Sequence, residues 1–166
     1  MKLEFGSNGP SKKSGFLTVD VRNIPCVDYV CNAWDIGNHV AVTSVSEIYS
    51  RHFFEHLTFR QGSLVLHIWK SILKPGGILE IMIPNMDLHI EQFRGLKTNQ
   101  KAITGFWGWQ RGDLLDTWDV HKSGYNLDSL TKVLHTHEYI NVESLKGPMH
   151  KHLHVTCIKP LEKDTT

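Results

Sequence analysis

The stretch Lys2-Leu-Glu-Phe-Gly-Ser-Asn-Gly9, together with Thr18-Val-Asp20, decides the fold of this chain. It predicts a β-strand that runs into a tight turn, followed by a second strand that ends in a carboxylate. Gly6 lets the backbone of the turn come close to a ligand, because it has no side chain. A carboxylate beside such a turn can accept hydrogen bonds from ribose hydroxyls. The stretch therefore indicates a site for a nucleotide-type cofactor.

Length and charge limit the possible classes of protein. The chain has 166 residues, enough for one sizeable core, and we expect a single domain over residues 1–166. Its 18 basic and 17 acidic residues give a formal net charge of +1. Electrostatics therefore provide no reason to expect a nucleic acid partner. No apolar run approaches about 18 residues and the first residues lack a signal peptide, so we expect no membrane insertion.

The three cysteines, Cys26, Cys31 and Cys157, are odd in number and lack C-x-x-C spacing. This pattern predicts reduced thiols and a cytoplasmic protein.

The apolar periodicity alternates between short strand-like and longer helix-like segments, which indicates an α/β fold. Strands are expected at residues 2–5, 15–21, 27–31, 45–50, 78–83, 139–145 and 153–158. The segment 78–83 is nearly all apolar, as expected for a central strand covered on both faces. Thr58 and Gln61 fit a capping box at the start of a helix that ends before Lys74-Pro-Gly-Gly77. A second helix is expected after the N-cap candidate Asn126.

Residues 94–125 fit neither pattern, and they hold Phe106, Trp107, Trp109 and Trp118 among several glycines. A loop this long in a compact domain is usually functional or disordered, and the aromatic side chains argue against disorder. We expect the segment to be an insertion that covers the substrate side. Its three tryptophans either form a stacking wall for a flat ring or a sugar face, or pack within the loop.

Four segments in order resemble the class I S-adenosylmethionine-dependent methyltransferases, and in particular their type 11 branch of small-molecule enzymes. They are Leu3-Glu-Phe-Gly-Ser-Asn-Gly9, Phe16-Leu-Thr-Val-Asp20, His52-Phe-Phe-Glu-His-Leu57 and Leu73-Lys-Pro-Gly-Gly-Ile-Leu79. The resemblance covers roughly residues 2–85. It implies a Rossmann-like fold with a mostly parallel seven-stranded sheet and an antiparallel final strand. Gly6 and Asp20 are too close in sequence for a normal crossover, so the first helix is expected to be reduced to a turn at 10–14.

The resemblance also implies a site for S-adenosylmethionine. It places Glu4 near the methionine amino group and Asp20 on the ribose hydroxyls. Asn32 or Asp35 would contact the adenine amino group, and Ala33 or Trp34 would pack against the base. The expected cofactor residues are Glu4, Phe5, Gly6, Ser7, Asn8, Gly9, Asp20, Val21, Asn32, Ala33, Trp34, Asp35, Ser50 and Arg51. Asn8 stands where the family usually has glycine, and asparagine tolerates left-handed φ better than most residues. The alternative for the turn is a plain hairpin or loop.

Methyl transfer from a sulfonium needs an aligned acceptor and, for an amine or hydroxyl, a base that removes its proton. His52 and His121 are the catalytic candidates, because imidazole titrates near neutral pH. His52 is preferred for its place after the fourth strand, and the alternative for His121 is an ordinary loop residue. Substrate contacts are expected from Trp107, Trp109, Trp118 and Tyr125.

The histidines also allow metal-binding interpretations. His52-Phe-Phe-Glu55-His56 matches the H-x-x-E-H pattern of inverted zinc peptidases, but such enzymes need a further carboxylate ligand and a larger fold. Glu55 and His56 are instead expected to anchor the helix start and neighbouring loops by hydrogen bonds. His150, His152 and His154 alternate, and we interpret them as the polar, solvent-facing side of the last strand. No metal is expected.

The sequence thus predicts methyl transfer to a small-molecule acceptor, including a sugar or a lipid. One alternative is a non-catalytic cofactor-binding or scaffold protein with the same fold. A zinc-dependent hydrolase built on the histidines is the other. A homodimer that completes the acceptor pocket is compatible with so small a domain.

Overall fold

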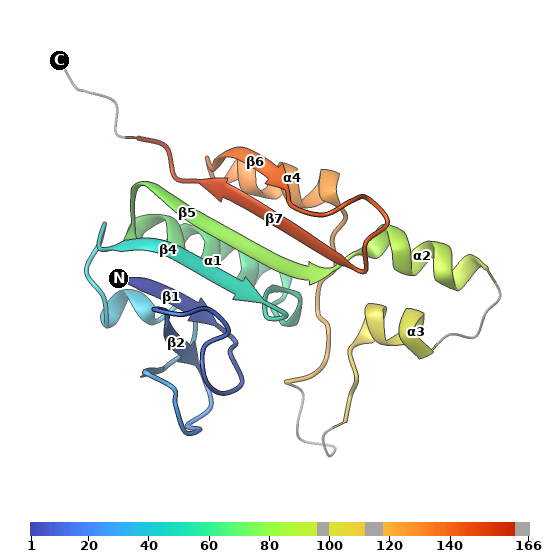
Figure 1. Cartoon of the computed structure of the whole chain (residues 1–166), viewed down its shortest axis with the longest axis horizontal. Coiled ribbons are helices and arrows are strands. Elements are labelled where there is room, and N and C mark those ends of the chain that lie inside the picture. Colours follow the sequence, from blue (N-terminus) through green and yellow to red (C-terminus); the bar gives the residue numbers. More distant parts are fainter. Residues whose placement is uncertain (96–99, 112–117, 162–166) are drawn as a thin grey trace.

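A seven-stranded sheet with the order β3-β2-β1-β4-β5-β7-β6 forms the centre of the molecule. The computed structural model describes residues 1–95, 100–111 and 118–161 (Figure 1). The strands are β1 (Lys2–Phe5), β2 (Leu17–Asp20), β3 (Tyr29–Val30), β4 (Val45–Arg51), β5 (Leu73–Pro84), β6 (Ile140–Ser144) and β7 (His152–Ile158). The helices are α1 (Phe59–Ile72), α2 (Met86–Arg94), α3 (Gln100–Trp107) and α4 (Leu127–Thr136), with short 3₁₀ turns η1 (Ile36–Asn38) and η2 (Phe54–His56).

The predicted Rossmann-like α/β class is confirmed. β1, β2, β3, β4 and β5 pair in parallel, and β7 is antiparallel to both of its neighbours, β5 and β6. The chain passes from β1 to β2 without an intervening helix, as the short spacing predicts. None of the helices in the described ranges is long and apolar enough to cross a membrane.

The helices α1 and α4 lie behind the sheet in Figure 1, and the main apolar core forms between them and the strands. Trp69 of α1 is fully buried there, with its ring centroid 4.7 Å from that of Phe5. Both helices begin as the sequence predicts. Thr58 and Asn126 each accept a hydrogen bond from a backbone N–H at the third helical position and complete a capping box.

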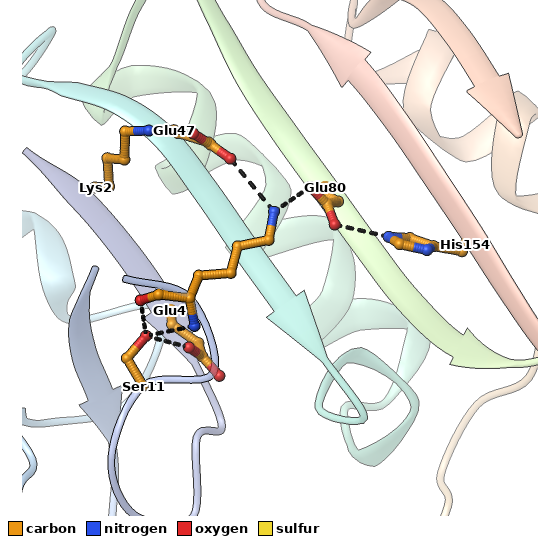
Figure 2. Close-up of polar contacts among 7 residues, drawn as sticks. Lys2, Glu4, Ser11, Glu47, Glu80 and His154 are labelled. Atoms are coloured by element: carbon orange, nitrogen blue, oxygen red, sulfur yellow. Dashed lines mark hydrogen bonds and ion pairs between the residues drawn. The ribbon is translucent and has the colours of Figure 1, made fainter. Parts of the chain in front are cut away.

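The opposite face of the sheet is polar, and no described helix covers it (Figure 1). The ammonium group of Lys13 lies between the carboxylates of Glu47, at 3.4 Å, and Glu80. Glu80 also contacts Nε2 of His154 at 2.7 Å, and Figure 2 shows the group spanning several strands. Residues 79–83 are buried or part-buried on both faces, as predicted, and only Ile78 at the start of the segment is exposed. On this face the cover is a loop that carries Lys13, in place of a crossover helix.

Two helices were not predicted. α2 follows β5 directly and is capped by Asn85, whose side chain accepts a hydrogen bond from the N–H of Asp87. α3 lies within the segment 94–125, which the sequence analysis interprets as irregular throughout. Both lie beyond the carboxyl end of β5 (Figure 1). Residues 96–99 and 112–117 of that segment lie outside the described ranges.

Candidate functional site

An open cleft of about 1000 Å³ lies at the carboxyl ends of β1, β2 and β4. Ligands of open α/β sheets bind at this edge. Most of the predicted site residues line the cleft: Phe5, Gly6, Ser7, Asn8, Asp20, Val21, Asn32, Ala33, Trp34, Arg51, His52, Trp109, Trp118 and His121. Segments that are far apart in the sequence thus converge on one cavity.

The turn after β1 has the backbone conformation that its sequence predicts. Gly6 has a φ of +73° and Asn8 a φ of +50°, both in the left-handed region. The N–H of Gly6 donates to the carbonyl of Val19 at 3.1 Å, which ties the turn to β2. A Cβ on Gly6 would lie 2.6 Å from Cβ of Phe53. The glycine is therefore required by protein packing as well as by its φ.

Asp20 ends β2 with a nearly buried carboxylate whose partners come from Arg22. Nε of Arg22 donates to Oδ1 at 3.0 Å and Nη2 donates to Oδ2 at 2.9 Å. Burial acts to raise the pKa of the Asp20 carboxyl. The Arg22 hydrogen bonds and charge, with a smaller contribution from the Asn8 backbone, outweigh burial and leave that pKa below 3.8. Asp20 is thus a fixed anion at the rim of the turn.

His52 follows β4 in a left-handed conformation, with φ +49°, an uncommon backbone state for a non-glycine residue. Its N–H donates to the carbonyl of Met82 at 2.8 Å, and its Nδ1 lies 3.3 Å from Oε1 of Glu55. The tautomer that suits this contact has Nδ1 donating to the carboxylate, and it leaves a lone pair on Nε2. The arrangement matches that of a base held by a carboxylate.

The loop that carries His121 is anchored by the backbone of Glu55 and the side chain of His56, so the predicted loop-anchoring role holds for the His56 side chain, whereas the Glu55 side chain contacts His52 instead. The carbonyl oxygen of Glu55 accepts from the N–H groups of Lys122 at 2.8 Å and Ser123 at 3.1 Å. Nδ1 of His56 lies 3.0 Å from the carbonyl oxygen of Val120.

His121 is half-buried in the cleft wall. Its Nδ1 lies 3.0 Å from the carbonyl oxygen of Gly105, and its ring centroid lies 5.0 Å from that of His56. Burial lowers the pKa of His121 below 6.5 and outweighs the opposing effect of Glu55. The imidazole is therefore neutral at neutral pH.

Several solved methyltransferases share this architecture. A SAM-dependent methyltransferase from Methanosarcina mazei superposes with a TM-score of 0.63 and 15% identity, over 97% of this chain and 92% of that one. The 1,6-didemethyltoxoflavin-N1-methyltransferase of Burkholderia thailandensis was solved with bound 1,6-didemethyltoxoflavin and S-adenosylhomocysteine. It superposes with a TM-score of 0.61 and 10% identity, over 96% of this chain and 71% of that one. The CurJ carbon methyltransferase superposes with a TM-score of 0.62 and 13% identity over 96% of this chain. This chain spans only 48% of that protein. No protein-family model and no curated protein matches the sequence.

This chain has the class I S-adenosylmethionine-dependent methyltransferase fold. Within that methyltransferase fold, six of the predicted site residues do not line the cleft, namely Glu4, Gly9, Asp35, Ser50, Trp107 and Tyr125. Glu4 lies on the polar face, where its Oε2 accepts from Oγ of Ser11 at 2.5 Å (Figure 2). The same oxygen also accepts from the N–H of Lys12 at 2.7 Å. It therefore holds the loop that replaces the first helix of the methyltransferase fold.

Three other predicted residues have packing or supporting positions. Tyr125 is buried, with ring centroids 5.7 Å from Phe54 and 5.7 Å from Phe59, so its predicted substrate role is wrong. Ser50 is fully buried in β4. Asp35 accepts a hydrogen bond from Nδ2 of Asn32 at 2.9 Å, and it therefore orients Asn32, which does line the cleft.

Two predicted residues lie outside the cleft for geometric reasons. Trp107 is 53% exposed and packs on Phe106, with ring centroids 5.2 Å apart. Gly9 has a φ of +128°, and a Cβ at this position would meet no described atom within 4 Å, so the residue lies in open space at the outer end of the turn.

The cleft of this methyltransferase fold also has walls that the sequence analysis missed. They include Lys12, Arg22, Phe53, Gln61, His89, Gln92, Thr104, Arg111, Asp119, Lys122 and Lys151. Arg22, Phe53 and Lys12 had a local signal, since they lie two positions after the motif carboxylate, within the His52–Leu57 motif and within the expected turn at 10–14. The others come from segments that only the folded chain brings to the cavity.

Proposed function

We propose that this protein is an S-adenosylmethionine-dependent methyltransferase with a small-molecule acceptor, a class that includes sugars and lipids. The observation that carries the proposal is the convergence of the opening turn, Asp20, the Asn32–Trp34 segment and His52 on one cleft. Each of these is a predicted site element, and each comes from the carboxyl end of a different strand. A scaffold protein that binds no cofactor would not need them to share a cavity.

The residues present fit the cofactor. Gly6, Ser7 and Asn8 form a small-residue cradle that a backbone-bound ligand can approach. The Asp20 carboxylate faces the same cavity as an anion and can accept hydrogen bonds from ribose hydroxyls. Ala33 and Trp34 supply an apolar surface for a flat base. When bound, S-adenosylmethionine supplies an electrophilic methyl group on a sulfonium sulfur.

The chain's own residues have three tasks in this mechanism. Glu55 fixes the tautomer and orientation of His52 through the 3.3 Å contact, which leaves Nε2 to take the proton of an amine or hydroxyl acceptor. Trp109 and Trp118 line the cleft and are each more than half exposed, so they can stack on an acceptor. Thr104, Gly105 and His121 line the cleft on the side of α3 and would limit the access of water to the reacting groups.

Calorimetric titration of the full chain with S-adenosylhomocysteine tests the proposal. We expect saturable binding at one site. In Asp20→Asn the dissociation constant should rise about 10- to 100-fold, because lost hydrogen bonds to a charged group are worth about 1.5–3 kcal/mol. Asp128→Asn, an exposed position in the first turn of α4, is the matched control and should bind normally.

No detectable binding by well-folded protein would refute the proposal. Binding without methylated product across a panel of hydroxyl and amine acceptors would favour the non-catalytic alternative.

A further inference from the structure

Three side chains that line the cleft form a cluster with the composition of a metal site. Glu55 and His56 come from η2, and His121 comes from the loop before α4. Their potential ligand atoms all lie within 4.8 Å of one another. Ligand atoms about 2.0–2.2 Å from one tetrahedral Zn²⁺ lie about 3.3–3.6 Å apart. Binding therefore requires the longest separation to contract by about 1.2–1.5 Å, a shift that rotation of the side chains can supply.

In each imidazole the nitrogen left over from the backbone contact is Nε2. Nδ1 of His56 lies 3.0 Å from the carbonyl oxygen of Val120, and Nδ1 of His121 lies 3.0 Å from that of Gly105. A carbonyl oxygen only accepts, so each Nδ1 carries the hydrogen and each Nε2 keeps its lone pair. Backbone carbonyls commonly orient metal-ligating histidines in this way.

Glu55 gives an independent indication of a missing ligand. Its side chain is almost fully buried, and its Oε2 has no hydrogen-bond partner among the described residues. Its other oxygen, Oε1, contacts Nδ1 of His52 at 3.3 Å, and this is the only ion pair of Glu55 that involves described residues. A buried carboxylate oxygen without a partner is unfavourable. A cation at the cluster would satisfy it.

We propose that Glu55, His56 and His121 bind one divalent transition-metal ion of the Zn²⁺ class, with one coordination position open to the cleft. Two imidazoles and one carboxylate favour such an ion over Mg²⁺ or Ca²⁺, which prefer all-oxygen sites. Three protein ligands with one open position are typical of catalytic rather than structural zinc sites. The inference differs from the sequence-based expectation of no metal. It uses only Glu55 and His56 of the H-x-x-E-H pattern, because His52 pairs with Glu55 and the third ligand is the distant His121.

If the protein is a methyltransferase, as proposed above, the open coordination position gives the ion a role in activating the acceptor. An acceptor hydroxyl bound there would be held beside His52, and coordination would lower its pKa. Its proton would pass to Nε2 of His52, and the oxygen would keep the electron pair that forms the new bond to the methyl carbon. The bond between that carbon and the sulfonium sulfur would break, with its electron pair left on the sulfur of S-adenosylhomocysteine, which leaves. His121 would then be a ligand rather than the alternative base.

Titration of metal-free full-length protein with Zn²⁺ tests the site without any methyl transfer. We expect one ion per chain. In Glu55→Gln and His121→Asn the dissociation constant should rise at least about 100-fold, beyond the 10- to 100-fold typical of changes around the ligands. His150→Ala is the control, because it removes an imidazole of the other histidine group, and it should leave the affinity unchanged. Circular dichroism and thermal unfolding verify that each variant is folded. The visible absorption of bound Co²⁺ provides a second readout on the parent protein and should indicate tetrahedral coordination.

No stoichiometric Zn²⁺ binding, equal binding by all variants, or a loss confined to His150→Ala would each overturn the metal site. Titration of the same metal-free protein with S-adenosylhomocysteine separates the two proposals. Zn²⁺ binding without nucleoside binding would leave the metal site and remove its role toward the acceptor. Nucleoside binding without Zn²⁺ binding would do the reverse.

Discussion

At the scale of single residues, Gly6 shows how a ligand-binding turn and the core constrain one position together. Its φ of +73° suits glycine, and a Cβ there would lie 2.6 Å from Cβ of Phe53. Phe53 packs against the core, with its ring centroid 6.1 Å from that of Phe5. Any side chain at position 6 therefore disturbs both the turn and the packing beneath it.

We expect Gly6→Ala to lower the free energy of unfolding by about 2 kcal/mol, from the unfavourable φ and the overlap with Phe53. Urea denaturation measures this. In a Phe53→Ala background the same substitution should lower the free energy of unfolding by less. The alanine Cβ would no longer overlap with the Phe53 ring, whereas the unfavourable φ would remain. An equal cost in both backgrounds would show that Phe53 does not restrict position 6.

His152 is part-buried beside His52, with ring centroids 4.6 Å apart, and its pKa lies well below the usual value. Burial is the main cause, and the pKa falls to about 4 with the help of neighbouring positive or ionisable groups, namely His52, Lys151, His150 and Arg51. Between pH 6.5 and 4 the unfolded chain therefore binds a proton at this position that the folded chain does not bind. The free energy of unfolding should fall as the pH falls through this window.

We expect His152→Gln to reduce the loss of stability between pH 6.5 and 4, because glutamine does not titrate. Thermal unfolding of parent and variant at half-unit pH steps measures the difference. If the two curves remain parallel through the whole window, His152 is not a source of the pH dependence.

At the scale of elements, the loop between β1 and β2 replaces a helix by a few polar anchors. Lys13 lies between Glu47 and Glu80, and its ammonium group is also 4.4 Å from the ring centroid of Tyr49. Glu4 holds the same loop through Ser11 and Lys12. The strands can carry carboxylates on this face because the loop supplies their partners. In most sheets of this class a helix would demand apolar side chains there.

Lys13→Met should lower the free energy of unfolding by about 1–2 kcal/mol, since Glu47 and Glu80 would lose their shared cation while the lysine itself is part-exposed. Lys12→Met is the matched control, because only the backbone N–H of Lys12 contacts Glu4, and it should change stability little. Urea denaturation compares the two. Equal effects of both substitutions would contradict a specific role for the Lys13 ion pairs.

At the scale of the whole molecule, the cleft joins the turn after β1, the end of β2, η2 and the segment that follows α3. A ligand that bridges these parts stabilises the folded chain as a unit. S-Adenosylhomocysteine at 100 times its dissociation constant should add about 2.7 kcal/mol of stability. This corresponds to a rise of roughly 5–10 °C in the melting temperature for a domain of this size. Asp20→Asn at the same ligand concentration should show a smaller rise, and no rise in the parent would argue against a cofactor site.

Much of the architecture could be predicted from local patterns. The capping residues Thr58 and Asn126, the break at Lys74-Pro-Gly-Gly77 and the missing first helix all depend on interactions within a few residues. The helix α2 had a comparable signal, since Asn85 is an N-cap candidate directly after an apolar strand, and it was missed. The positions of Asp20, Asn32 and His52 at the cleft follow from the rule that parallel strands end at one edge.

The sequence by itself determined the order of the strands, the conformation of the turn at Gly6 and Asn8, and the edge of the sheet where the site lies. Backbone hydrogen bonding, capping and φ preferences are local, so a short stretch of residues specifies them. Only the tertiary structure decided that Glu4 holds a loop, that Tyr125 is buried, and that His121 meets Glu55 and His56. These outcomes depend on contacts between segments that are far apart in the sequence, and no local pattern encodes such contacts.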